Sequence, residues 1–213
     1  MITQNAVFGR SKQKLGGVVT TTWKGKNVVK SKPLTVANPR TANQVGQRDR
    51  VTFIVQFYRL IAGVVKPSFK SLAIGMSEFN AFSSENLKNG FITNSGLSIT
   101  KDWSKFVTGK GTIGATDIST VSASNGSAAV TISYSNSDLP VGASLNDFAY
   151  AIVYNVTQDK VGIAAATDMR SDGSIEVTMP SNCATSDVLK CYLSFTNNAA
   201  SISGNSSYKT KTV

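Results

Sequence analysis

The sequence predicts a β-rich α+β protein with a basic front third and a rear half built from short strands. Three observations carry this prediction: one long amphipathic segment, regularly spaced β-branched segments, and an uneven distribution of charge. The chain has 213 residues, which is enough for one large or two small domains with a sizeable core. We expect two parts, a basic α+β module over residues 1–112 and a β-sandwich over residues 113–213.

The long amphipathic segment predicts a helix from Thr41 to Gly63. Thr41 and Gln44 have the spacing of a capping box, which satisfies free N–H groups at a helix start. Gly63 and Pro67 are expected to end the helix, by allowing a left-handed cap and by refusing to continue. One apolar face is formed by Val51, Ile54, Val55, Tyr58, Ile61 and Ala62, and a second row by Phe53, Phe57, Leu60 and Val64.

A helix with two apolar faces has to be covered on both sides. A sheet on one side and a short helix carrying Phe79 and Phe82 on the other would do this within one chain. Another subunit packed against the helix is the alternative, and it would give a homo-oligomer through Thr41–Gly63. The short helix is expected to begin after Ser77 and to end at Asn89-Gly90, and strands joined by a turn should follow over residues 91–111.

A hairpin is predicted ahead of the long helix. Residues 17–23 and 28–32 are rich in β-branched side chains and flank the turn Lys24-Gly25-Lys26-Asn27. Pro33 and Pro39 then impose an extended connection to the helix. The tail from Ile2 to Leu15 is polar and basic, and we expect it to be an arm that becomes ordered when a partner receives it.

The rear half predicts an immunoglobulin-like β-sandwich. Seven short segments of β composition occur in about 100 residues, a number and spacing typical of that fold, whereas a jelly roll needs eight strands. The expected strands are Asp117–Ala123, Ala128–Ser135, Asp147–Asn155, Lys160–Thr167, Ser174–Met179, Val188–Thr196 and Ser201–Thr210.

The net charge of +10 is concentrated at the front of the chain. Residues 1–70 hold 13 Lys or Arg and one acid, which gives +12. Residues 71–110 contribute +1, and residues 111–213, with five bases and eight acids, contribute −3. Such polarity suits an acidic partner at the basic end.

The residue types that most enzymes need are scarce. The chain contains no histidine, which removes the Ser-His-Asp and Cys-His arrangements and the commonest general base. The string Gly109-Lys110-Gly111-Thr112 lacks the upstream glycine of a phosphate loop. We expect a protein that is not an enzyme, with no catalytic residues and no cofactor.

Metal and membrane binding are also unsupported. Cys183 and Cys191 are two thiols without histidine, so they do not make a zinc site, and we interpret them as small semi-buried residues. A calcium site formed by loop acids, Asp138, Asp168 and Asp172, is a weak alternative. The first residues have no apolar signal-peptide core, and no run approaches the ~18–20 apolar residues of a membrane span.

The basic front end is the candidate binding region. Its side chains could dock on an acidic protein surface, track nucleic-acid phosphates, or form a solvated face. Trp23, which lies among them, is either a buried anchor of the hairpin or a hot spot of an interface. The candidate partner-binding residues are Arg10, Lys12, Lys14, Trp23, Lys24, Lys26, Lys30, Lys32, Arg40, Arg48 and Arg50.

Three motifs in the first 60 residues resemble an uncharacterised domain family common in Bacteroidetes-type genomes and in phages of those hosts. They are Trp23-Lys24-Gly25, the basic segment ending Ser31-Lys32-Pro33, and Asn38-Pro39-Arg40-Thr41 followed by Gln44 and Gln47-Arg48. The resemblance implies a β-sandwich-like tail. In phages, such as crAss-like phages, it implies a virion structural protein, most naturally an auxiliary or decoration protein of the capsid.

That resemblance sets expectations for partners and location. The partners would be the major capsid protein or other virion proteins, and the location would be the virion after synthesis in the host cytoplasm. Two alternatives stay open. One is a nucleic-acid-binding or packaged virion protein. The other is a receptor- or carbohydrate-binding head or tail module, for which Tyr134, Phe148 and Tyr208 are the aromatic candidates.

Overall fold

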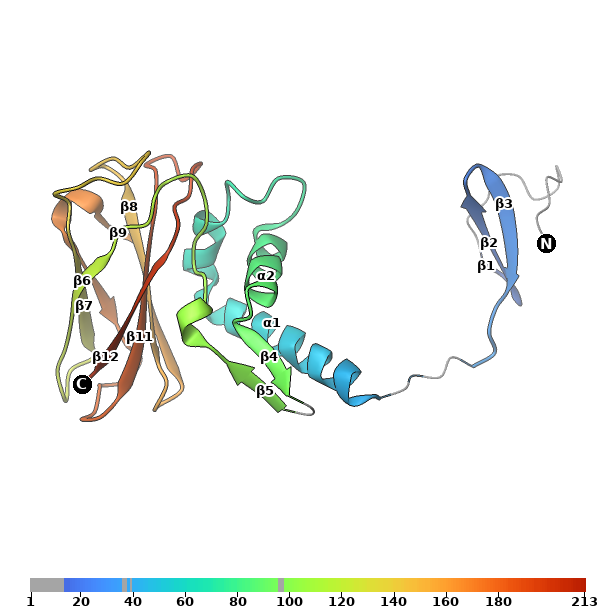
Figure 1. The fold of residues 1–213 in the computed structure, drawn as a ribbon, viewed down its shortest axis with the longest axis horizontal. Helices are drawn as coiled ribbons and strands as arrows, with labels where there is room; N and C mark the ends of the chain where they lie inside the picture. The colour runs from blue at the N-terminus through green and yellow to red at the C-terminus, as the bar shows by residue number, and fades with distance from the viewer. Residues whose placement is uncertain (1–13, 36–37, 39, 96–97) are drawn as a thin grey trace. The chain divides into compact units, whose positions relative to one another are not determined.

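The computed structural model describes residues 14–35, 38, 40–95 and 98–213. Internal contacts divide the chain into two compact units between Arg40 and Thr41. This division differs from the boundary predicted near residue 112, because the long helix packs against the sandwich. Figure 1 shows the elements of each unit.

The first unit is a small antiparallel sheet made of β1 (Lys14–Leu15), β2 (Val18–Trp23) and β3 (Lys26–Ser31), in that order. The predicted hairpin is confirmed, but its turn has two residues instead of four. Lys24 and Gly25 both adopt positive φ, at 48° and 77°, as a tight turn matched to strand twist requires. Of the predicted arm, only residues 14–15 are described, as β1, and the rest lies outside the described residues.

The second unit begins with the long helix α1 (Ala42–Ser68), and Thr41 caps it by accepting a hydrogen bond from the Gln44 N–H at 3.4 Å. The predicted end at Gly63 is wrong, because the helix continues through Pro67 to Ser68. The extra turn is stabilised by burial, since Val64 and Val65 are fully inaccessible to solvent. Gly63 is helical, and a Cβ at that position would lie 3.5 Å from Ile163 Cδ1.

The middle of the chain follows the prediction closely. Helix α2 (Glu78–Lys88) starts at the Ser77 cap, and Gly90 follows it with a positive φ of 82°. A two-stranded ladder of β4 (Ile92–Ser95) and β5 (Ser98–Lys101) comes next, and then a short 3-10 turn, η1 (Trp103–Lys105).

The rear half forms the predicted sandwich, with strands β6 (Ile118–Ala123), β7 (Ala129–Tyr134), β8 (Phe148–Asn155), β9 (Lys160–Met169), β10 (Ser174–Thr178), β11 (Val188–Thr196) and β12 (Ser207–Thr212). A 3-10 turn, η2 (Arg170–Asp172), precedes β10. One sheet has the order β10-β7-β6 and the other β12-β11-β8-β9, all antiparallel. The fourth strand, β9, joins the sheet of β8, whereas constant-type immunoglobulin domains place the fourth strand in the other sheet.

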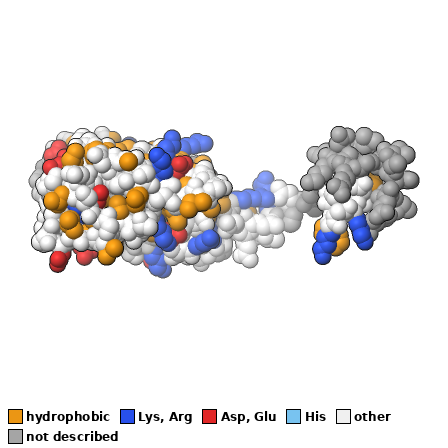
Figure 2. Space-filling model, turned by 90° about the horizontal axis from the view of Figure 1, so that it is seen from above, with side chains coloured by type: hydrophobic (Ala, Val, Ile, Leu, Met, Phe, Trp, Pro, Cys, Tyr) orange, Lys and Arg blue, Asp and Glu red, His pale blue; other side chains and the backbone are white. Residues whose placement is uncertain are grey.

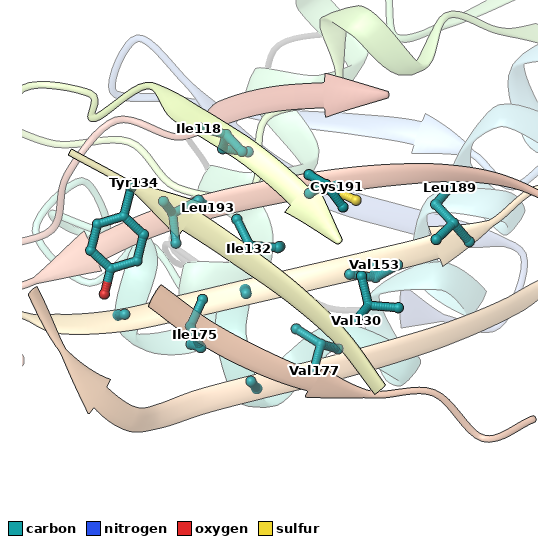
Figure 3. Close-up of a cluster of buried hydrophobic side chains, with 14 of the residues drawn as sticks. Ile118, Val130, Ile132, Tyr134, Val153, Ile175, Val177, Leu189, Cys191 and Leu193 are labelled. Atoms are coloured by element: carbon teal, nitrogen blue, oxygen red, sulfur yellow. The ribbon is translucent and has the colours of Figure 1, made fainter. Parts of the chain in front are cut away.

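The sandwich core lies between the two sheets. Figure 3 shows side chains of the three-stranded sheet, among them Ile132 and Val177, directed toward those of β8 and β11, among them Val153 and Leu193. Alternating inward positions on β7, β8, β10 and β11 supply most of this core, as expected for an aligned sandwich.

A second core covers the outer face of the four-stranded sheet. Tyr150, Ile152 and Tyr154 of β8 and Tyr192 of β11 point away from the sandwich interior and pack with side chains of α1 and α2. The helices therefore share a core with the sandwich, which is why the predicted boundary near residue 112 does not separate two compact units.

The two apolar rows of α1 are covered within this second unit. On the second row Phe57 and Val64 are buried and Phe53 is half-buried against Phe91, as the prediction of a sheet on one side and α2 on the other requires. Leu60 on this row and Val51 on the first row are the exceptions, with 60% and 42% of their surfaces exposed.

Candidate partner-binding face of the hairpin unit

The pairing of β2 with β3 places the apolar and basic candidates on one face of the hairpin. Trp23 pairs with Lys26, Thr21 with Val28, and Val19 with Lys30. Residues directly opposite one another in an antiparallel ladder project to the same side, and alternate residues along a strand share a face. One face therefore presents an apolar centre with lysines near both ends.

Trp23 is the most prominent side chain of this face, with 61% of its surface exposed. The Lys24 ammonium lies 5.0 Å from the centre of the Trp23 ring, within the range of a cation–π contact. A hollow beside the ring is lined by Thr21, Thr22, Trp23, Val28 and Lys30. Of the two roles considered for Trp23, this exposure fits the interface hot spot and not the buried anchor.

The charge of this unit is of one sign. Residues 1–40 contain eight Lys or Arg and no Asp or Glu, whereas residues 41–213 contain fourteen bases and twelve acids. The unit thus carries +8 of the net +10. Because it contains no acidic side chain, its lysines find no counter-charge within it. Figure 2 shows Lys or Arg side chains gathered beside a hydrophobic side chain on this unit.

The structure distributes the other predicted residues over both units. Arg10 and Lys12 lie outside the described residues, and Lys14 belongs to β1. Lys32 and Arg40 are exposed in the connection to α1. This leaves Lys24, Lys26 and Lys30 with Trp23 as the residues that the hairpin brings together.

Arg48 and Arg50 lie on α1, in the second unit. The Arg50 guanidinium donates to Gln47 Oε1 at 3.1 Å and to the Leu87 carbonyl at 2.9 Å. It thereby joins α1 to the last turn of α2, a structural role that the sequence pattern did not indicate.

The phosphate-loop-like string has a structural explanation. A Cβ at Gly109 would lie 2.8 Å from Ser194 Cβ, and one at Gly111 would lie 1.9 Å from the Ser203 carbonyl oxygen. Lys110 between them forms an ion pair with Glu85. Both glycines are therefore needed where the chain passes close to β11 and the segment after it.

A buried ion pair at one end of the sandwich was not foreseen from the sequence. Arg170 is fully buried and its Nε lies 3.4 Å from Asp147 Oδ2, an ion pair in which Nε makes no well-formed hydrogen bond. Its guanidinium carbon lies 3.7 Å from the centre of the Phe195 ring, and Nη1 bonds Thr116 Oγ1. Burial lowers the pKa of Arg170, and the Asp147 carboxylate opposes that shift.

Other chemistry is not apparent in the parts of the chain that the structure describes. No three His, Cys, Asp or Glu side chains gather there as metal ligands would, so Asp138, Asp168 and Asp172 form no such cluster. None of the helices in those parts combines the length and apolar character needed to cross a bilayer.

The aromatic residues proposed for a receptor-binding edge are packed inside the second unit. Tyr134 is buried in the sandwich core, where its ring contacts Phe195, and its hydroxyl donates to the Met169 carbonyl. Phe148 and Tyr208 are partly buried against the second core. These three residues therefore do not form an exposed aromatic edge.

Comparison with known families matches residues 9–210 to a family of unknown function (DUF6266). The match confirms the expectation of an uncharacterised domain family, and it covers almost the whole chain. A search among curated proteins found no match.

Proposed function

This chain belongs to DUF6266, a family of unknown function, and from its own geometry we propose that it is a non-enzymatic attachment protein. Its basic hairpin unit docks on an acidic protein surface and thereby attaches the sandwich unit to a larger assembly. The observation that carries the proposal is the hairpin face on which exposed Trp23 stands among lysines, in a unit of charge +8 that lacks acids.

The lysines and the tryptophan on this face contribute to binding in different ways. Lysines steer an acidic partner and fix its register, and a desolvated tryptophan next to a hollow supplies affinity. A solvated face would account for the lysines, whereas Trp23, 61% exposed beside a hollow, adds an aromatic anchor that a partner can bury.

The small size of the hairpin unit also favours docking on the surface of a partner. A hairpin with one short additional strand is marginally stable in water without something to pack against. Trp23 is exposed in it, so a partner that covers this side chain stabilises the unit as it binds. We place the attachment in a virion, where this chain is an auxiliary or decoration protein bound to the major capsid protein or to another virion protein.

The test removes charge from the hairpin without touching the second unit. In the full chain, Lys24, Lys26, Lys30 and Lys32 are changed together to Gln, and co-sedimentation with purified phage particles is measured at about 50–150 mM salt. We expect attachment to be lost while the thermal transition of the second unit is unchanged.

A matched control removes the same charge from exposed positions of the second unit: Arg59, Lys66, Lys70 and Lys160 changed to Gln. This variant should attach as the parent does. Equal attachment by both variants, or by the hairpin variant and the parent, contradicts the proposal. Mass spectrometry that fails to find the chain in purified virions refutes the virion setting.

Nucleic-acid binding is the second candidate, and the exposure of Trp23 is the observation that favours it. An exposed aromatic ring among lysines can stack on an unpaired base, which is worth ~1–3 kcal/mol per base. The assay is titration of the full chain with a single-stranded oligonucleotide, read by tryptophan fluorescence. Steeply salt-dependent quenching that Trp23→Ala abolishes supports this candidate, and no binding at about 50 mM salt eliminates it.

A further inference from the structure

The loop that joins α1 to α2 exposes three large apolar side chains in close succession. Leu72, Ile74 and Met76 are 38%, 83% and 49% exposed. Apolar side chains scattered singly over a surface are ordinary, whereas a contiguous group marks an interaction site. Figure 1 shows this loop running from the end of α1 to the start of α2.

The structure holds this loop in place. The Ser71 and Ser203 hydroxyls are hydrogen-bonded, and Ser71 Oγ also accepts from the Ser203 N–H at 3.3 Å. Ala73 packs against the second core, and the Ala73 N–H donates to the Phe69 carbonyl at 3.1 Å. The exposed side chains are therefore presented on a fixed backbone, which lowers the entropy cost of binding through them.

A groove lies beside these side chains. On α2 its residues follow the spacing i, i+3, i+4 and i+7, so they share one helical face, and the small side chains of Ala81 and Ser84 leave room above the helix. The groove encloses about 190 Å³, below the ~300–1,000 Å³ typical of small-molecule sites, which fits one side chain better than a metabolite. Its walls are Leu72, Met76, Ala81, Ser84, Glu85 and Lys88.

We infer that this surface is a two-fold interface between copies of this chain, in which Ile74 of each copy enters the groove of the other. Ile74, which is 83% exposed, lies in the chain between Leu72 and Met76, and both of these residues line the groove. In an isologous contact, residue i of one copy meets residue j of the other and the reverse, so such a surface is complementary to itself.

The charges around the groove point to the same partner. Glu78 opens α2 and Lys88 closes it, so two α2 helices packed antiparallel place each acid near the other copy's base. Because acidic and basic side chains both lie at this surface, it favours neither a polyanion nor a polycation as its partner. This interface differs from a contact through Thr41–Gly63, where Leu60 is an exposed apolar residue beside the exposed polar residues Gln56 and Arg59.

Sedimentation velocity of the full chain at about 1–100 μM tests the inference. We expect a concentration-dependent dimer that persists at about 0.5 M salt because the contact is mainly apolar. Ile74→Asp should weaken association at least tenfold. Val141→Asp is the matched control, because Val141 is 87% exposed in the connection between β7 and β8 and should leave the dimer unchanged.

Cross-linking provides a second and independent measurement. The Ile74→Cys and Ser84→Cys variants of the full chain, mixed under mild oxidation, should give an intermolecular disulfide, and the native thiols do not compete because both are buried. A chain that stays monomeric at every concentration overturns the inference. So does a dimer that Ile74→Asp leaves intact, or one that Leu60→Asp dissociates in its place.

Discussion

Replacing Arg170 with Met tests whether the buried ion pair stabilises the second unit. The change leaves the Asp147 carboxylate in the interior without its counter-charge and removes the cation from the Phe195 ring. Arg170 is 0% and Asp147 2% exposed, so water cannot compensate either group. Removing one partner of such a pair costs about 3–5 kcal/mol of unfolding free energy. For a unit of this size that corresponds to a fall in Tm of roughly 6–20 °C.

The assay is urea denaturation of the parent, Arg170→Met, Asp147→Asn and the double variant. Because the double variant leaves no isolated charge, it should be less destabilised than the sum of the single changes, with a coupling of about 1–3 kcal/mol. Lys105→Met is the control: Lys105 Nζ lies 3.3 Å from Asp102 Oδ2, but both side chains are about half exposed, so the unfolding midpoint should not move. A loss below ~1 kcal/mol for Arg170→Met, or additive single changes, would refute the reasoning.

Three further outcomes are expected in the full chain. Gly63→Ala should raise the unfolding free energy measured in urea by about 0.5–1 kcal/mol, because the helix continues through that position and the new methyl group makes only an ordinary contact. A lower unfolding free energy would mean that Gly63 is a left-handed cap. Gly111→Ala should lower it by about 1–3 kcal/mol or more, because the methyl would overlap a backbone carbonyl, and an unchanged midpoint would contradict this. Burial raises the pKa of the Cys183 thiol, and raises that of the Cys191 thiol to about 12 from a usual value near 9. Both thiols should therefore resist a disulfide reagent at pH 8 and react once guanidinium unfolds the chain. Stability should also fall as the pH rises from about 9 toward 12, where the unfolded thiol ionises first.

Local signals in the sequence were sufficient for most of the elements. The predicted strand Ala128–Ser135 is β7 at Ala129–Tyr134, because alternation and bounding turns fix a half-buried strand within a residue or two. Ser77 and Gly90 mark the ends of α2 for similar reasons, since capping depends on neighbours in the chain.

Signals that depend on distant packing were misjudged. Glycine and proline indicated a helix end at Gly63, but burial of the following turn against the sheet outweighed both. The boundary expected near residue 112 differs from the division between Arg40 and Thr41, because β8 contributes side chains to a core on each of its faces. Both of its alternating sets are apolar or aromatic, which is the pattern of a strand covered on two sides, so this signal was present in the sequence.

The sequence predicts which types of residue form the candidate face, but not which individual residues share it. Counting charge placed the binding region in the first third of the chain, and the hairpin motif placed Trp23 next to Lys24. Only the register of β2 and β3 shows that Trp23 shares a face with Val28 and Lys30. No pattern along the chain could distinguish Arg50, which bonds to α2, from the arginines available to a partner.

The tyrosines of β8 that point away from the sandwich interior, Tyr150 and Tyr154, join the sandwich to the helices through a shared core. The helices, the four-stranded sheet and the three-stranded sheet should unfold together, because the middle sheet belongs to both cores. A fragment that starts after residue 112 would lack the helices and would expose the tyrosine side chains on the outer face of the four-stranded sheet to water. Such fragments aggregate more readily than they fold.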